Sequence, residues 1–230
     1  MSPVDADADA DADGAGCATD DLLIVHRLLR TLFGKAPALV ESCDSDRRQK
    51  RIDEHLDEIT GALHRHHQGE DITLWDRLTQ RRPACALHVE LMRAQHADIS
   101  QLLDEVDAAR AVWRAGRLGG GAALLAALDR LNEALNAHLT DEERFVPEAA
   151  GALLTQAEWD EMRDHGIATM PRERLLIQLG YLMREMDSDE ERERFWRGVP
   201  VMARALYRLF GARQLSRELA ELYGTADSRR

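Results

Sequence analysis

The sequence has no apolar run approaching the roughly 20 residues that a helix needs to cross a bilayer. Its N-terminus is acidic and lacks a basic segment followed by an apolar one, so we expect no secretory signal. The three cysteines, Cys17, Cys43 and Cys85, are odd in number and form no recognisable motif, which indicates reduced thiols. We therefore expect a cytoplasmic protein with no membrane partner.

The sequence also has fewer basic than acidic residues, and few aromatic side chains. The formal net charge is -12 at pH 7, which argues against a nucleic-acid partner because the phosphate backbone requires a basic surface. Aromatic residues make up 5% of the chain and β-branched residues are sparse, whereas Ala, Leu, Arg and Glu dominate. These dominant residues lose little rotamer freedom in a helix, so the composition favours an all-α fold.

The chain divides into three expected parts. Residues 1–19 hold an Asp-Ala repeat with nothing large to bury, which predicts a disordered acidic tail. Residues 20–150 carry four long helical patterns and are expected to form a four-helix bundle. Residues 151–230 carry shorter patterns, which predict a C-terminal helical appendage. Two of the shorter helices begin at capping boxes, Thr155-Gln-Ala-Glu158 and Ser188-Asp-Glu-Glu191.

Capping residues, glycines and prolines set the expected helix limits. The four helices of the bundle are predicted over residues 20–33, 47–79, 83–117 and 122–146. Gly34 and Pro147 are expected to end the first and the last helix, Pro37 to lie in a connection, and Gly119-Gly120-Gly121 to separate the third helix from the fourth. In the appendage we expect first-turn prolines at Pro171 and Pro200 and a helix stop at Gly211.

Each of the four helical patterns has an apolar seam with spacings of three and four residues, typical of a packed helix. Polar residues interrupt every seam: His26 in the first, His66 and Glu70 in the second, His96 in the third, and His138 and Glu142 in the fourth. Burying a carboxylate without partners costs several kcal/mol, so four such interruptions need a shared cause. A metal cluster held by facing helices supplies one. Histidine and glutamate at i and i+4 lie on one helix face and can reach the same cluster.

The other polar residues near these seams receive an ordinary interpretation. A single histidine on an apolar face is more often structural than a ligand, so we interpret His55, His64, His88 and His165 as surface or structural residues. Asp141 and Glu143 are interpreted as solvated.

Taken as a set, these residues resemble the haemerythrin-like, HHE cation-binding domain family over residues 20–150. The resemblance rests on His26, the segment His66-His67-Gln68-Gly69-Glu70-Asp71, His96 and the segment His138-Leu139-Thr140-Asp141-Glu142. It implies an up-down four-helix bundle that holds two iron ions in an oxo- or hydroxo-bridged di-iron centre. It also implies bridging carboxylates at Glu70 and Glu142 and terminal nitrogens at His26, His66, His96 and His138.

His67 departs from the family pattern, because many relatives have glutamate at this position. Binding by His67 would give five histidines and two carboxylates, a count like that of the oxygen-carrying haemerythrins. Those proteins take a second histidine from the third helix, where this chain has Ser100. We interpret His67 as a ligand, the alternative being that it points outward to a partner beyond the metal.

The proposed ligands are rich in imidazole and poor in carboxylate. Carboxylate-rich sites with Glu-x-x-His pairs support oxidase chemistry, and the four seams carry no such pair. We therefore predict a protein that binds or senses dioxygen or a related small ligand, nitric oxide or peroxide. Two alternatives stay open: a peroxide-decomposing, catalase-like di-iron enzyme, and an iron-responsive regulatory or iron-storing protein. A zinc protease is disfavoured because His-Glu-x-x-His does not occur.

Overall fold

The computed structural model describes residues 16–116 and 121–224. Most of the tail predicted to be disordered, and two of the three glycines expected to separate the third and fourth helices, lie outside the described residues. Within the described ranges the chain is helical and has no strand, apart from an isolated bridge between Gly16 and Thr155. The all-α prediction is confirmed. None of the described helices combines the length and the apolar character that crossing a membrane requires.

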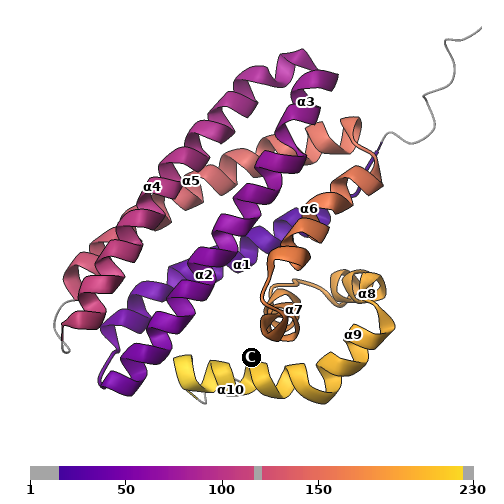
Figure 1. The fold of residues 1–230 in the computed structure, drawn as a ribbon. Helices are drawn as coiled ribbons and strands as arrows, with labels where there is room; N and C mark the ends of the chain where they lie inside the picture. The colour runs from indigo at the N-terminus through magenta and orange to yellow at the C-terminus, as the bar shows by residue number, and fades with distance from the viewer. Residues whose placement is uncertain (1–15, 117–120, 225–230) are drawn as a thin grey trace, which may run out of the picture.

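Four long helices lie side by side as an up-down bundle (Figure 1): α1 (Asp20–Glu41), α2 (Asp46–Thr73), α4 (Ala86–Ala115) and α5 (Gly121–Leu153). The α1 and α4 helices pack along α5, and α2 packs against both α1 and α4. The short helix α3 (Trp75–Arg81) and a 3₁₀ turn (Pro83–Cys85) connect α2 to α4.

The remaining helices form the C-terminal extension: α6 (Gln156–Thr169), α7 (Leu175–Arg184), α8 (Asp189–Gly198), α9 (Val201–Leu206) and α10 (Ala212–Tyr223). A 3₁₀ turn (Arg172–Arg174) precedes α7, and a π-helical turn (Tyr207–Gly211) joins α9 to α10. The α6 helix lies beside α2 (Figure 1). The α7 helix contacts α1, and the α10 helix contacts α2. Tyr181 and Leu222 belong to the same apolar cluster as Leu56 and Leu131, so the extension shares a core with the bundle.

The first helix is longer than the sequence predicts, because it continues through Gly34 and Pro37 to Glu41. A proline inside a helix lacks the N–H that would bond the carbonyl four residues earlier, here that of Phe33. Asn132 of α5 supplies the missing donor, since its Nδ2 donates to the Phe33 carbonyl at 3.0 Å. The prediction of a stop at Gly34 was wrong because the compensating group lies on another helix.

The last helix of the bundle is also longer than predicted. The α5 helix passes through Pro147 and ends at Leu153 rather than at Val146. Ala149 and Ala150, beyond the proline, are buried in the core. Burial of these additional turns stabilises the helix where local sequence favours an end.

The second helix is shorter than predicted, because the chain bends at Leu74 instead of continuing straight to Thr79. The Thr73 hydroxyl donates to the carbonyl of Gly69 at 2.8 Å. Such a bond from a side chain to the preceding turn commonly bends a helix.

The helix starts in the extension follow the predicted capping pattern in part. Thr155 and Glu158 form the complete capping box, with side chain and backbone paired in both directions. Ser188 accepts from the N–H of Glu191, but the Glu191 carboxylate accepts from the N–H of Asp187 instead of Ser188. The second box is therefore only half formed.

The predicted stop at Gly211 was wrong, because the π-helical turn carries the chain into α10. A Cβ at Gly211 would lie 2.6 Å from the ring of Tyr207, so glycine permits this close packing. Pro171 and Pro200 each stand directly before a helical segment, one residue earlier than a first-turn position.

Candidate metal centre

The bundle brings all seven predicted ligand residues together in its interior. They come from each of the four long helices: His26 from α1, His66, His67 and Glu70 from α2, His96 from α4, and His138 and Glu142 from α5. The side chain of His66 is the most exposed of the set at 9%, and those of Glu70 and Glu142 have no exposure. The cluster is therefore shielded from bulk water.

Apolar residues enclose this polar layer on both sides. Toward one end of the bundle, each helix places an apolar residue at a distance of four positions from a predicted ligand. These residues belong to one apolar cluster: Leu22, Leu74, Met92 and Val146. Toward the other end, each helix places an apolar residue at a distance of three positions from a predicted ligand. These residues belong to a second apolar cluster: Leu29, Leu63, Ile99 and Leu135. The helical repeat thus places the polar layer between two apolar layers.

The candidate ligand atoms form two overlapping groups, each with its atoms within 4.8 Å of one another. One group contains His67, Glu70, His96 and His138, and the other contains His26, His66, Glu70 and Glu142. Glu70 belongs to both groups. The arrangement provides two adjacent positions for a cation.

Both carboxylates lie between histidines of the two groups. Glu70 Oε1 lies 3.1 Å from His66 Nε2, and Glu70 Oε2 lies 3.4 Å from His96 Nε2. Glu142 Oε2 lies 3.4 Å from His26 Nε2 and 3.3 Å from His138 Nε2. Ligand atoms bound to one ion at about 2.0–2.2 Å lie about 3 Å apart, so this spacing suits shared coordination.

The donor atoms of the cluster are not satisfied by the protein. All four carboxylate oxygens of Glu70 and Glu142 are buried without a hydrogen-bond partner. The Nε2 atoms of His67, His96 and His138 are in the same condition. Buried polar atoms are rarely left unpaired, and a cation at this position would satisfy all of them. The residues present therefore fit a metal centre.

Electrostatics in the cluster reflect deep burial. Burial lowers the pKa of His66 to about 3, with the neighbouring His26 adding to the effect. Burial likewise holds the pKa of His67 well below its ordinary value. These imidazoles are neutral at physiological pH, which is the protonation state that binds metal.

In the metal-free protein the pKa values of the two carboxyl groups are shifted in opposite directions. Burial and the proximity of Glu142 raise the pKa of Glu70 well above its ordinary value. Burial also acts to raise the pKa of Glu142, but the surrounding His138, His26 and His66 outweigh burial and hold it well below its ordinary value. One carboxyl is thus protonated when the site holds no metal, and cation binding would release that proton.

The outer nitrogens of three histidines are held by polar side chains. His26 Nδ1 lies 3.0 Å from Glu143 Oε1, and Glu143 is also paired with Arg30. Burial acts to raise the pKa of Glu143, but His26 and Arg30 lower it to about 2. An ionised carboxylate therefore accepts from Nδ1 and leaves Nε2 of His26 available to bind a metal.

His96 and His138 are held in the same manner. His96 Nδ1 lies 2.9 Å from Asp71 Oδ1, which also accepts from the Trp75 indole at 3.0 Å. His138 Nδ1 lies 3.0 Å from Gln95 Oε1. These contacts turn each Nε2 toward the cluster.

The role of Glu143 was missed in the sequence, where it was interpreted as solvated. That interpretation was wrong, since Glu143 is hydrogen-bonded to His26. Asp141 is half-buried and accepts from Gln95 Nε2 at 3.0 Å, so it supports the side chain that holds His138. A signal existed: Asp71 and Glu143 each directly follow a predicted ligand, Glu70 and Glu142.

None of the four histidines assigned to surface or structure belongs to the two ligand groups of the cluster. His64 and His88 are exposed, His165 is half-buried, and His55 is buried beside α10 with Glu58 and Glu218. Arg174 pairs with both of these carboxylates, at 2.5 Å from Glu58 and 2.7 Å from Glu218. This second polar group is therefore an ion-pair network that holds the extension on the bundle.

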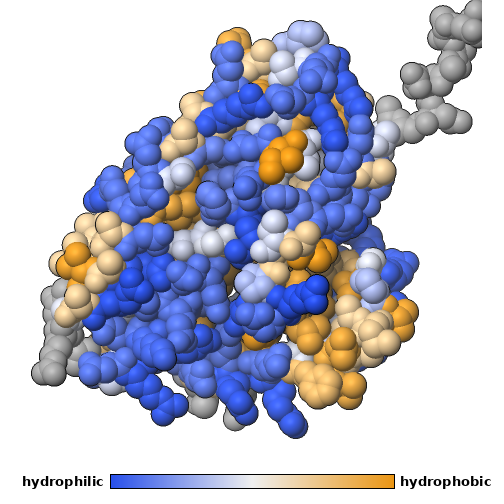
Figure 2. All heavy atoms as spheres, in the orientation of Figure 1, coloured by the Kyte–Doolittle hydropathy of each residue, from blue (hydrophilic) through white to orange (hydrophobic). Residues whose placement is uncertain are grey.

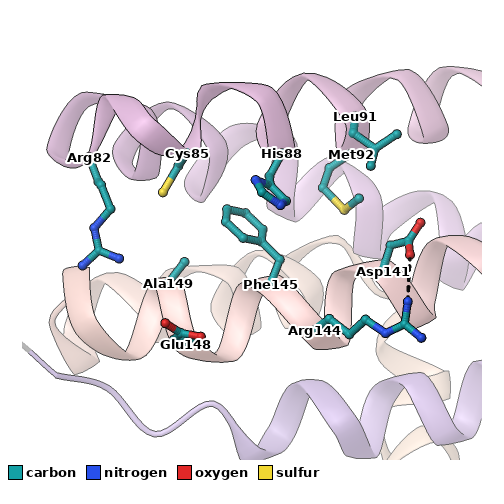
Figure 3. Close-up of a pocket in the computed structure, with 10 residues that line it drawn as sticks. All are labelled: Arg82, Cys85, His88, Leu91, Met92, Asp141, Arg144, Phe145, Glu148 and Ala149. Carbon is teal, nitrogen blue, oxygen red and sulfur yellow. Dashed lines mark ion pairs between the residues drawn. The ribbon is translucent and has the colours of Figure 1, made fainter.

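A surface pocket of about 400 Å³ lies between α4 and α5 (Figure 3). The rings of His88 and Phe145 stack across its middle, with centroids 4.7 Å apart. Met92 lines the pocket and stands one helical turn from His96 on α4. None of the seven clustered residues lines it.

Comparison with known proteins agrees with this geometry. A family profile described as the Hemerythrin HHE cation binding domain matches residues 17–149. No match was found among curated proteins or among solved structures. The matched segment spans more than half of the chain and contains all seven clustered residues. The chain therefore belongs to the hemerythrin HHE cation-binding domain family.

Proposed function

We propose that the protein holds two iron ions and binds or senses dioxygen or a related small ligand, nitric oxide or peroxide. The observation that carries this proposal is the composition of the cluster, five imidazoles and two carboxylates in two groups that share Glu70. Imidazole suits iron, whereas sites that oxidise substrates in helical bundles are richer in carboxylate.

The proposed ligands divide between the two positions. His67, His96 and His138 would hold one ion and His26 and His66 the other, with Glu70 and Glu142 between them. When bound, a pair of iron ions supplies a redox-active centre with affinity for small diatomic ligands and peroxide. Five neutral donors and two carboxylates would leave the pair with net positive charge, which would favour an anionic ligand such as peroxide.

The chain contributes exclusion of water and control of protons. The apolar layers on both sides keep the cluster dry, which strengthens electrostatic interactions within it. Glu143 and Asp71 hold the outer nitrogens of His26 and His96 and are themselves partly exposed. These hydrogen bonds fix which ring nitrogen carries the proton and connect both imidazoles to the protein surface.

An optical spectrum with metal analysis tests the proposal. Protein purified in air should contain about two irons per chain and show near-ultraviolet bands that are absent from a sample reconstituted with Zn²⁺. Reduction should remove these bands, and nitric oxide added to the reduced protein should produce new absorption that disappears when the gas is removed. Iron well below one per chain after reconstitution would contradict the centre. Sustained peroxide consumption would instead support the peroxide-decomposing enzyme.

A further inference from the structure

The C-terminal extension presents an apolar helix face to solvent. Its large exposed side chains are Val201 (72%), Met202 (70%), Leu206 (39%), Leu209 (67%) and Phe210 (55%). Their spacing places them on one side of α9 and the π-helical turn. The opposite side packs on α7, where Tyr207 approaches Gly180 closely. Figure 2 shows apolar atoms gathered at the lower right, over this part of the fold.

A stripe of arginines runs along the same helix: Arg204, Arg208, Arg213 and Arg217. Their intervals are four, five and four residues. Arg204 is half-buried, whereas Arg208, Arg213 and Arg217 are exposed, and the last two stand one turn apart on α10. None of the four has an acidic partner among the described residues, and Arg208 lies over the Trp196 ring at 5.6 Å.

The charge of this region opposes that of the whole chain. Residues 192–217 contain seven arginines and one acidic residue, Glu193, whereas the full chain has a formal charge of -12. The other three acidic residues of α8, Asp189, Glu190 and Glu191, lie in its first turn, before this segment begins. Asp189 and Asp20 pair with Arg192 and Arg194, so the positive charge available to a partner comes from the later arginines of the segment.

We propose that this face docks onto an anionic phospholipid bilayer. The apolar side chains would enter the boundary between head groups and acyl chains, and the arginines would meet the lipid phosphates, as in interfacial amphipathic helices. Such a helix lies in the plane of the membrane and spans nothing, so the absence of a spanning helix does not oppose it. The proposal departs from the sequence-based expectation of no membrane partner, which considered spanning segments alone.

A bilayer fits the observations better than a second copy of the chain. An isologous pairing through this face would gather the exposed arginines of both copies, Arg208, Arg213 and Arg217, near one contact, and like charges there are unfavourable. The α9 helix also stands at the outer edge of the molecule, where it can reach a flat surface (Figure 1).

Vesicle sedimentation of the full chain tests the proposal. The protein should sediment with vesicles of phosphatidylglycerol and phosphatidylcholine, and not with phosphatidylcholine alone, and the binding should weaken as salt is raised. The double substitution Leu209→Ser and Phe210→Ser should raise the lipid concentration for half-binding at least about tenfold. Arg213→Gln with Arg217→Gln should have a similar effect, since each arginine near an anionic surface adds appreciable affinity.

Matched control variants distinguish binding through this face from nonspecific adsorption of the protein to vesicles. Leu87→Ser with Val112→Ser removes two equally exposed apolar residues from α4, and Arg47→Gln with Lys50→Gln removes two exposed cations from α2. Both should sediment like the original protein. The proposal is overturned if the original chain binds neither vesicle, if the control variants lose binding equally, or if the chain is a dimer in solution that Leu209→Ser and Phe210→Ser convert to a monomer.

Discussion

The imidazole rings of His67 and His96 stack face to face, with centroids 4.1 Å apart and planes 12° from parallel. The two residues come from different helices, α2 and α4. Both have a buried Nε2 without a hydrogen-bond partner, and both belong to the group that contains Glu70 and His138. His67 therefore points into the cluster rather than outward, although it is the residue at which the chain departs from its family pattern.

We expect His67→Ala to lower bound iron and change the visible spectrum, because it removes one nitrogen from the proposed ligand set. His67→Glu should keep about two irons but shift the spectrum, since a carboxylate adds negative charge and stabilises ferric iron. Iron per chain and absorption spectra of both variants provide the measurement. If His67→Ala retains the original spectrum and iron content, the ligand set has six residues.

The ligand assignments on α5 lead to a second expectation. His138→Ala and Glu142→Ala should each lose most of the bound iron while the metal-free chain stays helical by circular dichroism. Loss of the metal removes the stabilisation that its binding gives to the folded chain, so the melting temperature should fall in both variants.

The control for these variants is His64→Ala, which removes an exposed histidine from α2, two residues from His66. It should keep the iron content and melting temperature of the original protein. Near-full iron in both α5 variants would remove these residues from the proposed ligand set.

The seams predict six of the seven clustered residues because the signal is local to each helix, whereas His67 borders its seam and was interpreted as a ligand by comparison with the family pattern. A seam position every three or four residues identifies the buried face, and His138 and Glu142 stand on it in place of leucine. The supporting residues could not be found in this way. Glu143 lies off the seam, and only the approach of α1 to α5 shows that it contacts His26.

Helix ends show the same limit. Gly34 and Pro37 are local signals for a stop, and local rules predict one. Asn132 overrides them from almost a hundred residues away, by donating to the carbonyl that the proline leaves unpaired. No sequence period links these positions, so the continuation of α1 can be seen only when the helices are packed.

Glu143 leads to a third prediction. Glu143→Ala should weaken metal binding by about 10- to 100-fold, because His26 loses the carboxylate that orients its ring. Competition with a chelator of known affinity measures this change. Glu133→Ala, which removes an exposed carboxylate from the same helix, should leave the affinity unchanged. Equal affinities for the two variants would show that Glu143 does not position His26.

His55 leads to a prediction about acid stability. Burial lowers its pKa from the ordinary 6.5 to about 4, although Glu218 acts in the opposite direction. Between these values the unfolded chain binds a proton that the folded chain does not, so stability falls as the pH drops from 6.5 towards 4. The loss amounts to at most about 3 kcal/mol.

Urea unfolding at several pH values should show this loss reduced in His55→Gln, which cannot be protonated, relative to the original chain. His64→Gln on the exposed face of α2 should keep the original dependence. Metal-free protein is the appropriate sample, because it avoids the release of metal at low pH, and the clustered histidines add the same pH dependence to all three proteins. Parallel pH profiles for His55→Gln and the original chain would contradict the assignment.

The last prediction concerns Asn132 and Pro37. Asn132→Ala leaves the buried Phe33 carbonyl without a donor, which should cost about 1–3 kcal/mol in the free energy of unfolding. Asn136→Ala is the control, since the amide of Asn136 bonds only within its own helix and is exposed. Pro37→Ala should rescue the first variant, because an alanine restores the N–H that bonds the Phe33 carbonyl in an ordinary helix. In a double-mutant cycle the two substitutions should therefore be strongly non-additive. Additive effects would show that Asn132 stabilises the bundle by some contact other than the one that lets α1 pass through Pro37.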